Sequence, residues 1–352
     1  MKFIHIADLH LGARPEAGEA YTQKRPEELW ESVHRIIQKC NEDEIDLLLV
    51  AGDVFHHQPM LRELKELDYL FSKLVKTHVV LIAGNHDYIK GDSFYKKFQW
   101  QSHVHFILNG EMSKLKLKDI STNVFGLSYQ TRNIEKDMLA YHEPKKDGNN
   151  ILLLHGGEEK YLPVNKQKLA SLNYDYIALG HIHKPMILAE NKMAYAGALE
   201  PIDRNDIGEH GYIFGEIKNQ KTKIRFCSFA KRSYVPLKLE VDVSDTAAQV
   251  KDKLSERIQE GGIDNIYKVT LVGFREADMY YDIAAFDQFK NIVQITDETK
   301  PYYDFKKIME KNKDNIIGLF IKELIDCEEG SMEYEALYQG VDALMTTRRN
   351  EA

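Results

Sequence analysis

Five short motifs rich in Asp, Asn and His lie in the first half of the chain, each directly after an apolar run. They are Asp8-Leu9-His10, Gly52-Asp53, Gly84-Asn85-His86-Asp87, His155-Gly156 and Gly180-His181-Ile182-His183. The apolar runs, residues 3–7, 45–51, 79–83, 151–154 and 174–179, predict buried strands. Ligands collect at the carboxyl ends of strands in open α/β sheets. We therefore expect seven oxygen and imidazole side chains to converge there: Asp8, His10, Asp53, Asn85, His155, His181 and His183.

These seven side chains predict a site for two divalent metal ions. Mixed imidazole and carboxylate ligands without thiolates favour Mn²⁺, with Fe²⁺ or Mg²⁺ as alternatives. Asp53 is the expected bridge, because one carboxylate can give an oxygen to each ion. Two ions held close together stabilise both the attacking and the leaving oxygen of a phosphoryl displacement. One ion is assigned to Asp8, His10 and His183, and the other to Asn85, His155 and His181.

Two further histidines are candidates for the reaction itself. His86 follows a predicted ligand directly and is placed to donate to the departing oxygen, as a general acid or as a positive hydrogen-bond donor. Asp87 either orients that imidazole or stabilises the turn, and the turn role is favoured. His56 is a second candidate near the scissile phosphate, with an exposed loop histidine as the alternative.

The other histidines are expected to have ordinary structural places. His5 lies within a predicted strand, and His103 and His105 alternate in an edge strand. Two more are expected near helix faces or ends, and three in loops: His34 and His78, then His57, His142 and His210. Most of these motifs are weak alone, and Gly84-Asn85-His86-Asp87 is sharper because Gly and Asn tolerate a tight turn. Five in this order, each after a strand-like run, make coincidence a poor explanation.

Composition limits the class of protein. The chain has 352 residues, enough for two or three domains, and 43% hydrophobic residues, enough for a full core. Its net charge of −8 argues against a broad basic surface for nucleic acid, although bound ions would make the local field positive. Three cysteines without paired spacing, no signal peptide and no long apolar run predict a reduced, cytoplasmic protein without a membrane segment.

The elements that must hold the motifs alternate strands with amphipathic helices. Residues 27–41 have an apolar face with helical period, and Pro59 is expected to begin a second helix. After His183 the pattern changes to short strands over 193–197, 211–218 and 223–229. We therefore predict an α/β fold in which two sheets, flanked by helices, form an α/β/β/α sandwich over residues 1–232.

Two smaller parts are predicted after the sandwich. Residues 233–298 read as a small α/β domain: a strand over 235–243, a helix over 245–260 closed by Gly261-Gly262, and a strand over 266–272. Residues 299–352 read as helices with a frayed end over 348–352. Their apolar positions either pack on the chain's own core or dock a partner helix. The docking residues would be Ile316, Leu319, Phe320, Leu324 and Ile325, with Leu337, Val341 and Leu344.

On these motifs the chain resembles the calcineurin-like metallophosphoesterases. More narrowly, it looks like the SbcD-type DNA repair nucleases, bacterial relatives of the meiotic-recombination-eleven nuclease, and within them the shorter YhaO-type branch. Four segments support this narrower resemblance: Ile6-Ala7-Asp8-Leu9-His10-Leu11-Gly12, Gly52-Asp53-Val54-Phe55-His56-His57-Gln58-Pro59, Leu179-Gly180-His181-Ile182-His183-Lys184-Pro185 and Ala196-Gly197-Ala198-Leu199-Glu200-Pro201. The resemblance is strong over residues 1–215 and only architectural beyond.

The resemblance implies roles that spacing alone does not. The seven predicted ligands fall on the family's manganese ligands, His86 on its catalytic histidine, and His56 on a histidine that positions the substrate phosphate. It implies DNA cleavage in double-strand-break repair, by 3′-to-5′ exonuclease and single-strand endonuclease activity. It also implies a module that caps the active site and contacts DNA, a homodimer formed by helices of the first domain, and C-terminal helices that bind an SbcC-like ABC-type ATPase.

Rival functions share parts of this pattern. The metal motifs also fit a small-molecule or cyclic-nucleotide phosphodiesterase, although such an enzyme would not need the residues beyond the sandwich. A protein phosphatase is disfavoured because no Arg-Gly pair follows Gly52-Asp53. The rival from another class is a regulatory subunit that binds an ATPase. Against it, every ligand position holds a competent residue.

Overall fold

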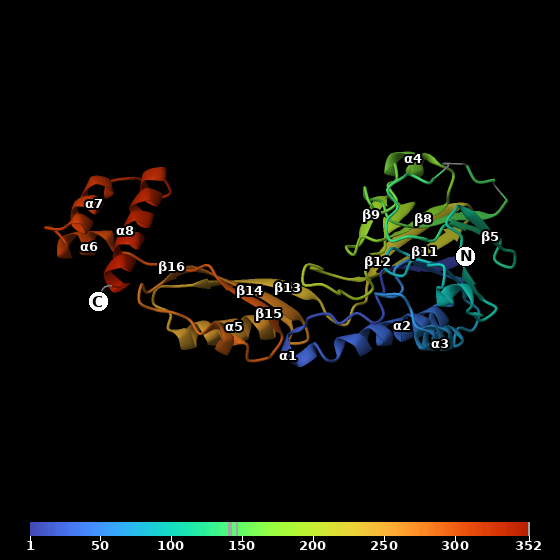
Figure 1. Ribbon diagram of the computed structural model, residues 1–352, viewed down its shortest axis with the longest axis horizontal. Coiled ribbons are helices and arrows are strands. Elements are labelled where there is room, and N and C mark those ends of the chain that lie inside the picture. The colour runs from blue at the N-terminus through green and yellow to red at the C-terminus, as the bar shows by residue number, and fades with distance from the viewer. Residues whose placement is uncertain (140–142, 146, 351–352) are drawn as a thin grey trace. The chain divides into compact units, whose positions relative to one another are not determined.

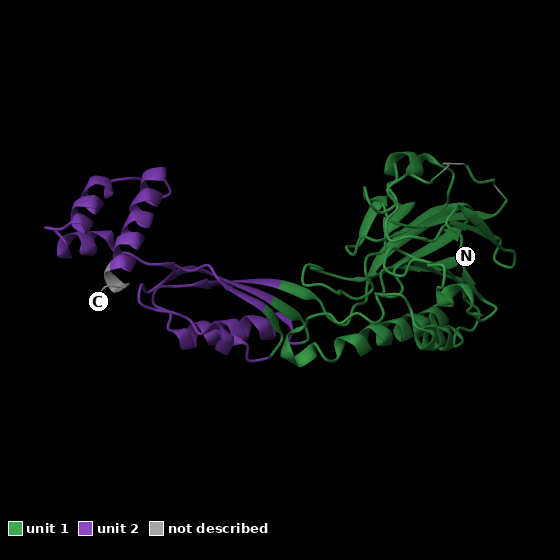
Figure 2. Cartoon of the chain, viewed as in Figure 1, with its two compact units in different colours: residues 1–235, 264–267, 290–293 green, residues 236–263, 268–289, 294–352 purple. Residues whose placement is uncertain are grey.

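The computed structural model describes residues 1–139, 143–145 and 147–350, and Figure 1 shows its elements. The expectations for His142 and for the last two residues of the frayed end lie outside these ranges. The chain forms two compact units (Figure 2): the first contains residues 1–235, 264–267 and 290–293, and the second the remainder. The division at residues 232 and 298 stays a prediction.

Two six-stranded sheets form the centre of the first unit. The first sheet has the order β12-β11-β1-β2-β3-β4, and the second has the order β5-β6-β7-β8-β10-β9. The strands of the first are β1 (Lys2–Ile6), β2 (Leu47–Ala51), β3 (His78–Ile82), β4 (Val104–Phe106), β11 (Gly211–Lys218) and β12 (Lys221–Ser228). Those of the second are β5 (Ser113–Leu117), β6 (Thr122–Gly126), β7 (Asn149–His155), β8 (Tyr176–Gly180), β9 (Met186–Ala189) and β10 (Met193–Tyr195).

The two sheets pack face to face, with helices outside. Phe3 and Leu49 of the first sheet share one buried cluster with Leu153 and Tyr176 of the second. The outer face of the first sheet is covered by α2 (Arg25–Glu42) and α3 (Leu61–Phe71), and that of the second by α4 (Lys166–Ser171) and its neighbouring loops. A short α1 (Gly18–Tyr21) precedes α2. The predicted two-sheet sandwich is confirmed.

Some local predictions for this unit need correction. Helix α3 begins at Leu61 rather than at Pro59. Met60 is its N-cap, and the Glu63 carboxylate accepts the Met60 N–H at 2.7 Å. His78 begins β3 instead of lying near a helix, because its backbone pairs with Leu47 of β2. The edge strand expected to hold His103 and His105 is present as β4, which contains His105, while His103 precedes it. Strands β5, β6 and β9 were not predicted. Alternating lysines weaken the apolar signal of β5, polar Thr122 and Asn123 begin β6, and β9 has only four residues.

The second unit contains most of a smaller sheet and its helix. This sheet has the order β13-β14-β15, with β16 beside β14. Its elements are β13 (Tyr234–Val241), α5 (Ala247–Gly261), β14 (Ile266–Arg275), β15 (Ile292–Asp297) and β16 (Lys300–Pro301). Thr246 caps α5 through the N–H of Gln249, and Gly262 ends the helix at φ 96°, as the Gly-Gly pair predicts. The short 3₁₀ turn η2 (Ile283–Phe286) lies between β14 and β15, and a second such turn, η1 (Phe94–Lys96), lies between β3 and β4 of the first unit.

The C-terminal helices pack against one another. They are α6 (Phe305–Lys311), α7 (Ile316–Leu324) and α8 (Met332–Asn350). The expected docking stripe is wrong in part, because Leu337 and Val341 are buried in the cluster formed by these helices. Asn315 caps the start of α7. The side chains of Ile316 and Leu319 face outward, and these two residues are 70% and 58% exposed. No helix among the described residues has the length and apolar character that crossing a membrane requires.

Candidate metal centre

The five motifs meet where strands of both sheets end. Asp8 follows β1, Asp53 follows β2 and Asn85 follows β3, while His155 ends β7 and His181 follows β8. Backbone hydrogen bonds join the first two motifs: Asp8 N–H donates to Gly52 O at 3.2 Å, and His10 N–H donates to Asp53 O at 3.0 Å. The structure thus brings together the side chains that the sequence placed at strand ends.

Four of the seven predicted ligands have strained backbones. Asp8, His10, Asp53 and His181 have φ values of 52°, 44°, 47° and 96°. Residues other than glycine rarely adopt positive φ, and each such residue costs on the order of 1–3 kcal/mol unless its surroundings hold it. Strain of this kind gathers at functional sites. Here the four residues lie in the loops after β1, β2 and β8, whose side chains meet at one centre.

The first half of the centre is formed by Asp8, His10 and His183, whose ligand atoms all lie within 4.8 Å of one another. His10 Nε2 lies 3.2 Å from His183 Nε2 and 3.7 Å from Asp53 Oδ2. Both oxygens of Asp8 accept the backbone N–H of His181, at 3.1 and 3.0 Å. This set is the one assigned to a single ion from the sequence, and that role stays a prediction.

The second half surrounds Asn85 and His155. The Oδ1 atom of Asn85 lies 2.9 Å from His155 Nε2 and 3.1 Å from His181 Nδ1. His155 Nδ1 faces Ala51 O at 2.9 Å, which leaves Nε2 as the ring nitrogen that can bind an ion. Asp53 Oδ2 is 3.3 Å from His155 Nε2 and also faces His10 of the other half. Asp53 therefore lies where a shared ligand is needed.

The charge in this pocket fits divalent cations. Asp8 and Asp53 are 0% and 2% exposed, and among the described residues no lysine or arginine forms an ion pair with either one. Burying two carboxylates without a permanent cation is unfavourable. The donor set contains carboxylate and amide oxygens with imidazoles, the chemistry that suits Mn²⁺, Fe²⁺ or Zn²⁺ better than Ca²⁺. The residues present thus fit a pair of bound divalent ions.

In the metal-free protein, protons partly replace that missing charge. Burial raises the pKa of Asp8 to about 6. Burial alone would also raise the pKa of Asp53, but the charge and hydrogen bond of His155 hold it well below its usual range. Burial would lower the pKa of His155, yet Asp53 raises it to about 9. His183 reaches about 9 in the same way, through its hydrogen bond with Asp206. Burial and nearby His155 lower the pKa of His181 to about 4.

Manganese affinity should therefore weaken as the pH falls below about 9, because His155 and His183 then carry a second proton in the metal-free protein. Each ring must lose the proton on Nε2 before this nitrogen can bind an ion, while Nδ1 keeps its own proton. The loss should approach about tenfold per pH unit for each proton released. Calorimetric titration at neutral pH in two buffers of different ionisation enthalpy counts these protons. A binding heat that does not depend on the buffer would contradict this assignment.

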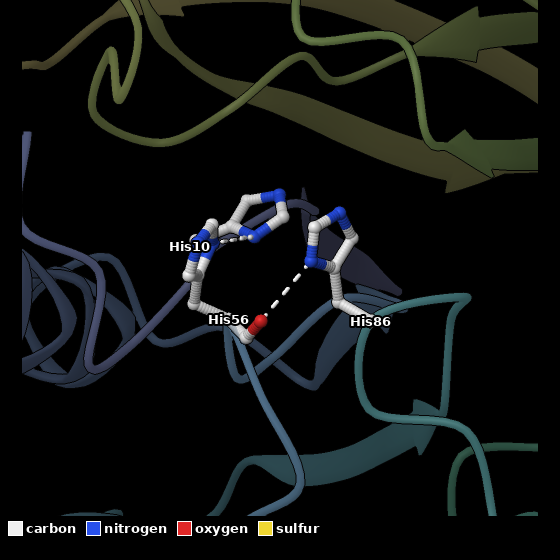
Figure 3. Close-up of side chains that lie close together, drawn as sticks. All are labelled: His10, His56 and His86. Carbon is white, nitrogen blue, oxygen red and sulfur yellow. Dashed lines mark hydrogen bonds between the residues drawn. The ribbon is translucent and has the colours of Figure 1, made fainter. Parts of the chain in front are cut away.

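His56 is exposed and His86 is half-buried, and both lie beside the buried His10 (Figure 3). His86 Nδ1 faces the backbone oxygen of His56 at 3.0 Å, and His56 Nδ1 is 3.3 Å from His10 Nδ1. The His56 and His86 rings stack with centroids 5.1 Å apart. A carbonyl accepts only, so His86 carries a proton on Nδ1 and keeps Nε2 for other partners. Burial and the neighbouring histidines lower the pKa of His56.

Asp87 stabilises the turn, as favoured from the sequence. Its carboxylate accepts the N–H groups of Gly84 and Val54 at 2.8 and 3.0 Å, and the hydroxyl of Tyr95 at 2.8 Å. The orienting role for His86 does not apply, because the Nδ1 atom of His86 faces the His56 backbone instead. Asp87 is fully buried, and burial raises its pKa to about 7. It joins the loop after β3 to the loop after β2.

Two carboxylates next to the predicted ligands were missed in the sequence. Asp206 lies 3.1 Å from His183 Nδ1, and Glu158 lies 3.2 Å from His181 Nε2. Each is separated from its histidine by 23 residues, and neither belongs to one of the five motifs. No spacing rule points to them, since their positions depend on the paths of two loops.

Comparison with known proteins gives a family match and several relatives, YhaO and Mre11 among them. A profile described as calcineurin-like phosphoesterase matches residues 1–185, more than half of the chain. The uncharacterized metallophosphoesterase YhaO of Bacillus subtilis is 29% identical over 248 residues, covering 64% of this chain and 60% of YhaO. The DNA double-strand break repair protein Mre11 of Methanocaldococcus jannaschii is 28% identical over 222 residues, covering 60% of this chain and 59% of Mre11.

The matches to YhaO and Mre11 do not extend over whole proteins. The chain spans about three fifths of the length of the curated relatives it matches. Among solved structures, a dimetal phosphatase from Danio rerio aligns with 65% of this chain and 99% of its own, at 10% identity and a TM-score of 0.39. A protein from Thermus thermophilus, TT1561, aligns with the same TM-score at 9% identity, over 64% of this chain and 98% of its own. Similarity this low carries no information about substrate.

Proposed function

The chain belongs to the calcineurin-like phosphoesterase family, and from this premise we propose that it is a DNA nuclease that uses two divalent ions, Mn²⁺ first among them. The family assignment makes it a metal-dependent phosphoester hydrolase, while the DNA substrate is our proposal. The observation that carries it is the convergence of two buried carboxylates with imidazoles around Asp53. Similarity to Mre11, a DNA double-strand break repair protein, supports the choice of DNA.

In the proposed reaction, the protein's own residues have distinct tasks. Bound ions would withdraw charge from the scissile phosphate and lower the pKa of water. One ion would be held by Asp8, His10 and His183, the other by Asn85, His155 and His181, and Asp53 would serve both. His86 keeps one proton on Nδ1 against His56 O, so a second proton on Nε2 makes it an imidazolium. That proton can pass to the departing oxygen. His56 would help position the phosphate.

Incubation of the purified protein with end-labelled DNA tests the substrate. Single- and double-stranded DNA are compared with Mn²⁺, Mg²⁺ or EDTA, and the product ladder reports the polarity of digestion. We expect Mn²⁺-dependent cleavage with 3′-to-5′ shortening. Cleavage of cyclic nucleotides or aryl phosphodiesters without cleavage of DNA would favour the alternative, a small-molecule phosphodiesterase. An ATPase-binding subunit without catalysis would cleave none of these substrates.

Two protein partners complete the proposal. An SbcC-like ABC-type ATPase would bind the C-terminal helices, where Ile316 and Leu319 of α7 and Met332 of α8 are 70%, 58% and 86% exposed. A second copy of the chain would pack on the first unit near α3, where Tyr69 and Val75 are 58% and 84% exposed. Exposed apolar side chains that lie together mark interaction sites on soluble proteins. The capping role of the second unit on DNA stays a prediction.

Replacing Ile316 and Leu319 together by Asp should abolish co-purification with the ATPase encoded by the same organism. Both side chains are largely exposed, so the charges disturb the docking face without entering the helical cluster. The expected loss of affinity is at least about 100-fold, typical of charges placed in an apolar interface. Ile187→Asp is the matched control, because Ile187 is exposed on the first unit and lies outside both proposed interfaces. Undiminished ATPase binding by the double variant would exclude this face.

A further inference from the structure

We propose that Asp206 is a positioning residue that makes the half of the centre formed by Asp8, His10 and His183 the tighter of the two ion-binding positions. The inference rests on the proposed two-ion function and adds a ranking of its two positions. It also assigns a task to a carboxylate outside the five motifs.

Asp206 fixes the orientation of His183. Its two carboxylate oxygens lie 3.2 and 3.1 Å from His183 Nδ1, so this nitrogen carries the proton and donates it to the carboxylate. The lone pair is then on Nε2, which points into the centre and lies 3.2 Å from His10 Nε2. A carboxylate behind a ligating imidazole fixes the tautomer and ring orientation, and it makes the ligating nitrogen more basic.

Asp206 is itself held in place. Its Oδ2 atom accepts the backbone N–H groups of Ile202 and Asp203, both at 3.0 Å, and its side chain is 12% exposed. These contacts close the loop after β10 around the carboxylate. The position of Asp206 is therefore set by the backbone of its own loop.

The start of that loop is anchored to helix α2. The buried side chain of Arg25 donates to Pro201 O at 2.8 Å and to Glu200 Oε2 at 3.1 Å. Glu200 Oε1 also accepts the hydroxyl of Ser32 at 2.5 Å and the backbone N–H of Lys231 at 2.7 Å. Hydrogen bonds in a buried, low-dielectric network of this kind hold their members firmly in place. The support of His183 thus extends from its ring to the outer helix of the sandwich.

The other half of the centre has weaker support. His181 Nε2 faces Glu158 Oε2 at 3.2 Å, but the Glu158 side chain is 54% exposed. Within the part of the chain that the structure describes, the Glu158 carboxylate accepts this one hydrogen bond. Solvent competes for an exposed carboxylate, so the pair fixes the ring only weakly. This half also has the neutral amide of Asn85 where the first half has the carboxylate of Asp8, and therefore attracts a cation less strongly.

The isosteric variants Asp206→Asn and Glu158→Gln test this ranking. Mn²⁺ is titrated into the full, EDTA-stripped chain by calorimetry. Wild type should bind two ions with unequal affinities. Asp206→Asn should weaken the tighter step by about 10- to 100-fold, the usual effect of losing a hydrogen-bonding partner behind a ligand. Glu158→Gln should change either step by less than about threefold, as expected for an exposed pair.

Two controls separate positioning from damage to the loop. Asp203→Asn removes a charge from the same loop, and its carboxylate accepts the Asn205 N–H rather than contacting His183. It should bind both ions as wild type does. The activity of Asp206→Asn should return toward the wild-type rate as Mn²⁺ is raised, because the defect is in affinity. A misfolded loop would not be rescued by the ion.

The possible outcomes distinguish this inference from the function on which it rests. If wild type binds only one ion under saturation, the two-ion function itself fails, and the ranking fails with it. If wild type binds two ions but Asp206→Asn binds them equally well, only the positioning role is overturned. Equal losses in Asp206→Asn and Glu158→Gln, or in Asp206→Asn and Asp203→Asn, would also overturn it.

Discussion

Asp53→Asn should abolish hydrolysis, with a loss of at least about 10³-fold, because ion-derived stabilisation of the transition state is worth several kcal/mol. Asp53 Oδ2 faces His10 Nε2 at 3.7 Å and His155 Nε2 at 3.3 Å, so both ion positions lose the same charged ligand. Its Oδ1 also accepts the backbone N–H of His86 at 2.9 Å. Asparagine keeps the size of the side chain and removes its charge.

Metal content and DNA cleavage should be measured together for this variant. Wild type should hold about two ions per chain, as a two-metal reaction requires. The variant should hold fewer, while its thermal unfolding in EDTA stays close to that of wild type. Asp92→Asn is the matched control, because Asp92 is exposed and outside the centre. If Asp53→Asn cleaves DNA at a tenth of the wild-type rate or faster, Asp53 is not the shared ligand.

Replacement of His86 by Gln should slow turnover by roughly 10²- to 10⁴-fold, the usual contribution of a general acid. The metal content should stay at the wild-type level, because the half-buried His86 ring is held by His56 O and is not one of the seven assigned ligands. An aryl phosphodiester should be affected less than DNA, since its leaving group departs without a proton. Turnover of both substrates is therefore compared in the same preparation.

His57→Gln provides the control for this change. His57 is the next histidine along the chain, and its ring lies 3.8 Å from Glu63, with 44% of the side chain exposed. Its replacement should leave turnover unchanged. Loss of an ion from His86→Gln would show instead that His86 is a ligand, because its nitrogen lies near those of His10 and His56.

The convergence of the centre could be predicted because it depends on local rules. A polar residue placed directly after a buried strand must lie at the sheet edge, and β1, β2, β3, β7 and β8 all have this arrangement. The same reasoning gave the turn role of Asp87, since its sequence neighbours include glycine and asparagine. Each of these features is decided within a few residues.

The features that were missed depend on long-range contacts. Asp206 meets His183 through the loop after β10, which is tied to Arg25 of α2, and no local pattern encodes that contact. The docking role predicted for Leu337 and Val341 of the C-terminal helices is wrong for a similar reason. The Asn315 cap separates α7 from α6, and it sets which apolar side chains turn inward. Leu337 and Val341 then fill the space between these helices.

The left-handed backbone at four predicted ligands sets the stability of the fold against the binding of metal ions. Glycine tolerates positive φ at Asp8, His10, Asp53 and His181 far better than these residues do, so it would relax the metal-free chain at each position. Selection for thermal stability alone would therefore favour glycine at each of these positions, and the ligands would be lost. Because most proteins have little stability to spare, the sandwich must supply the surplus that keeps these residues in place. The large double core beneath the centre is what makes that surplus possible.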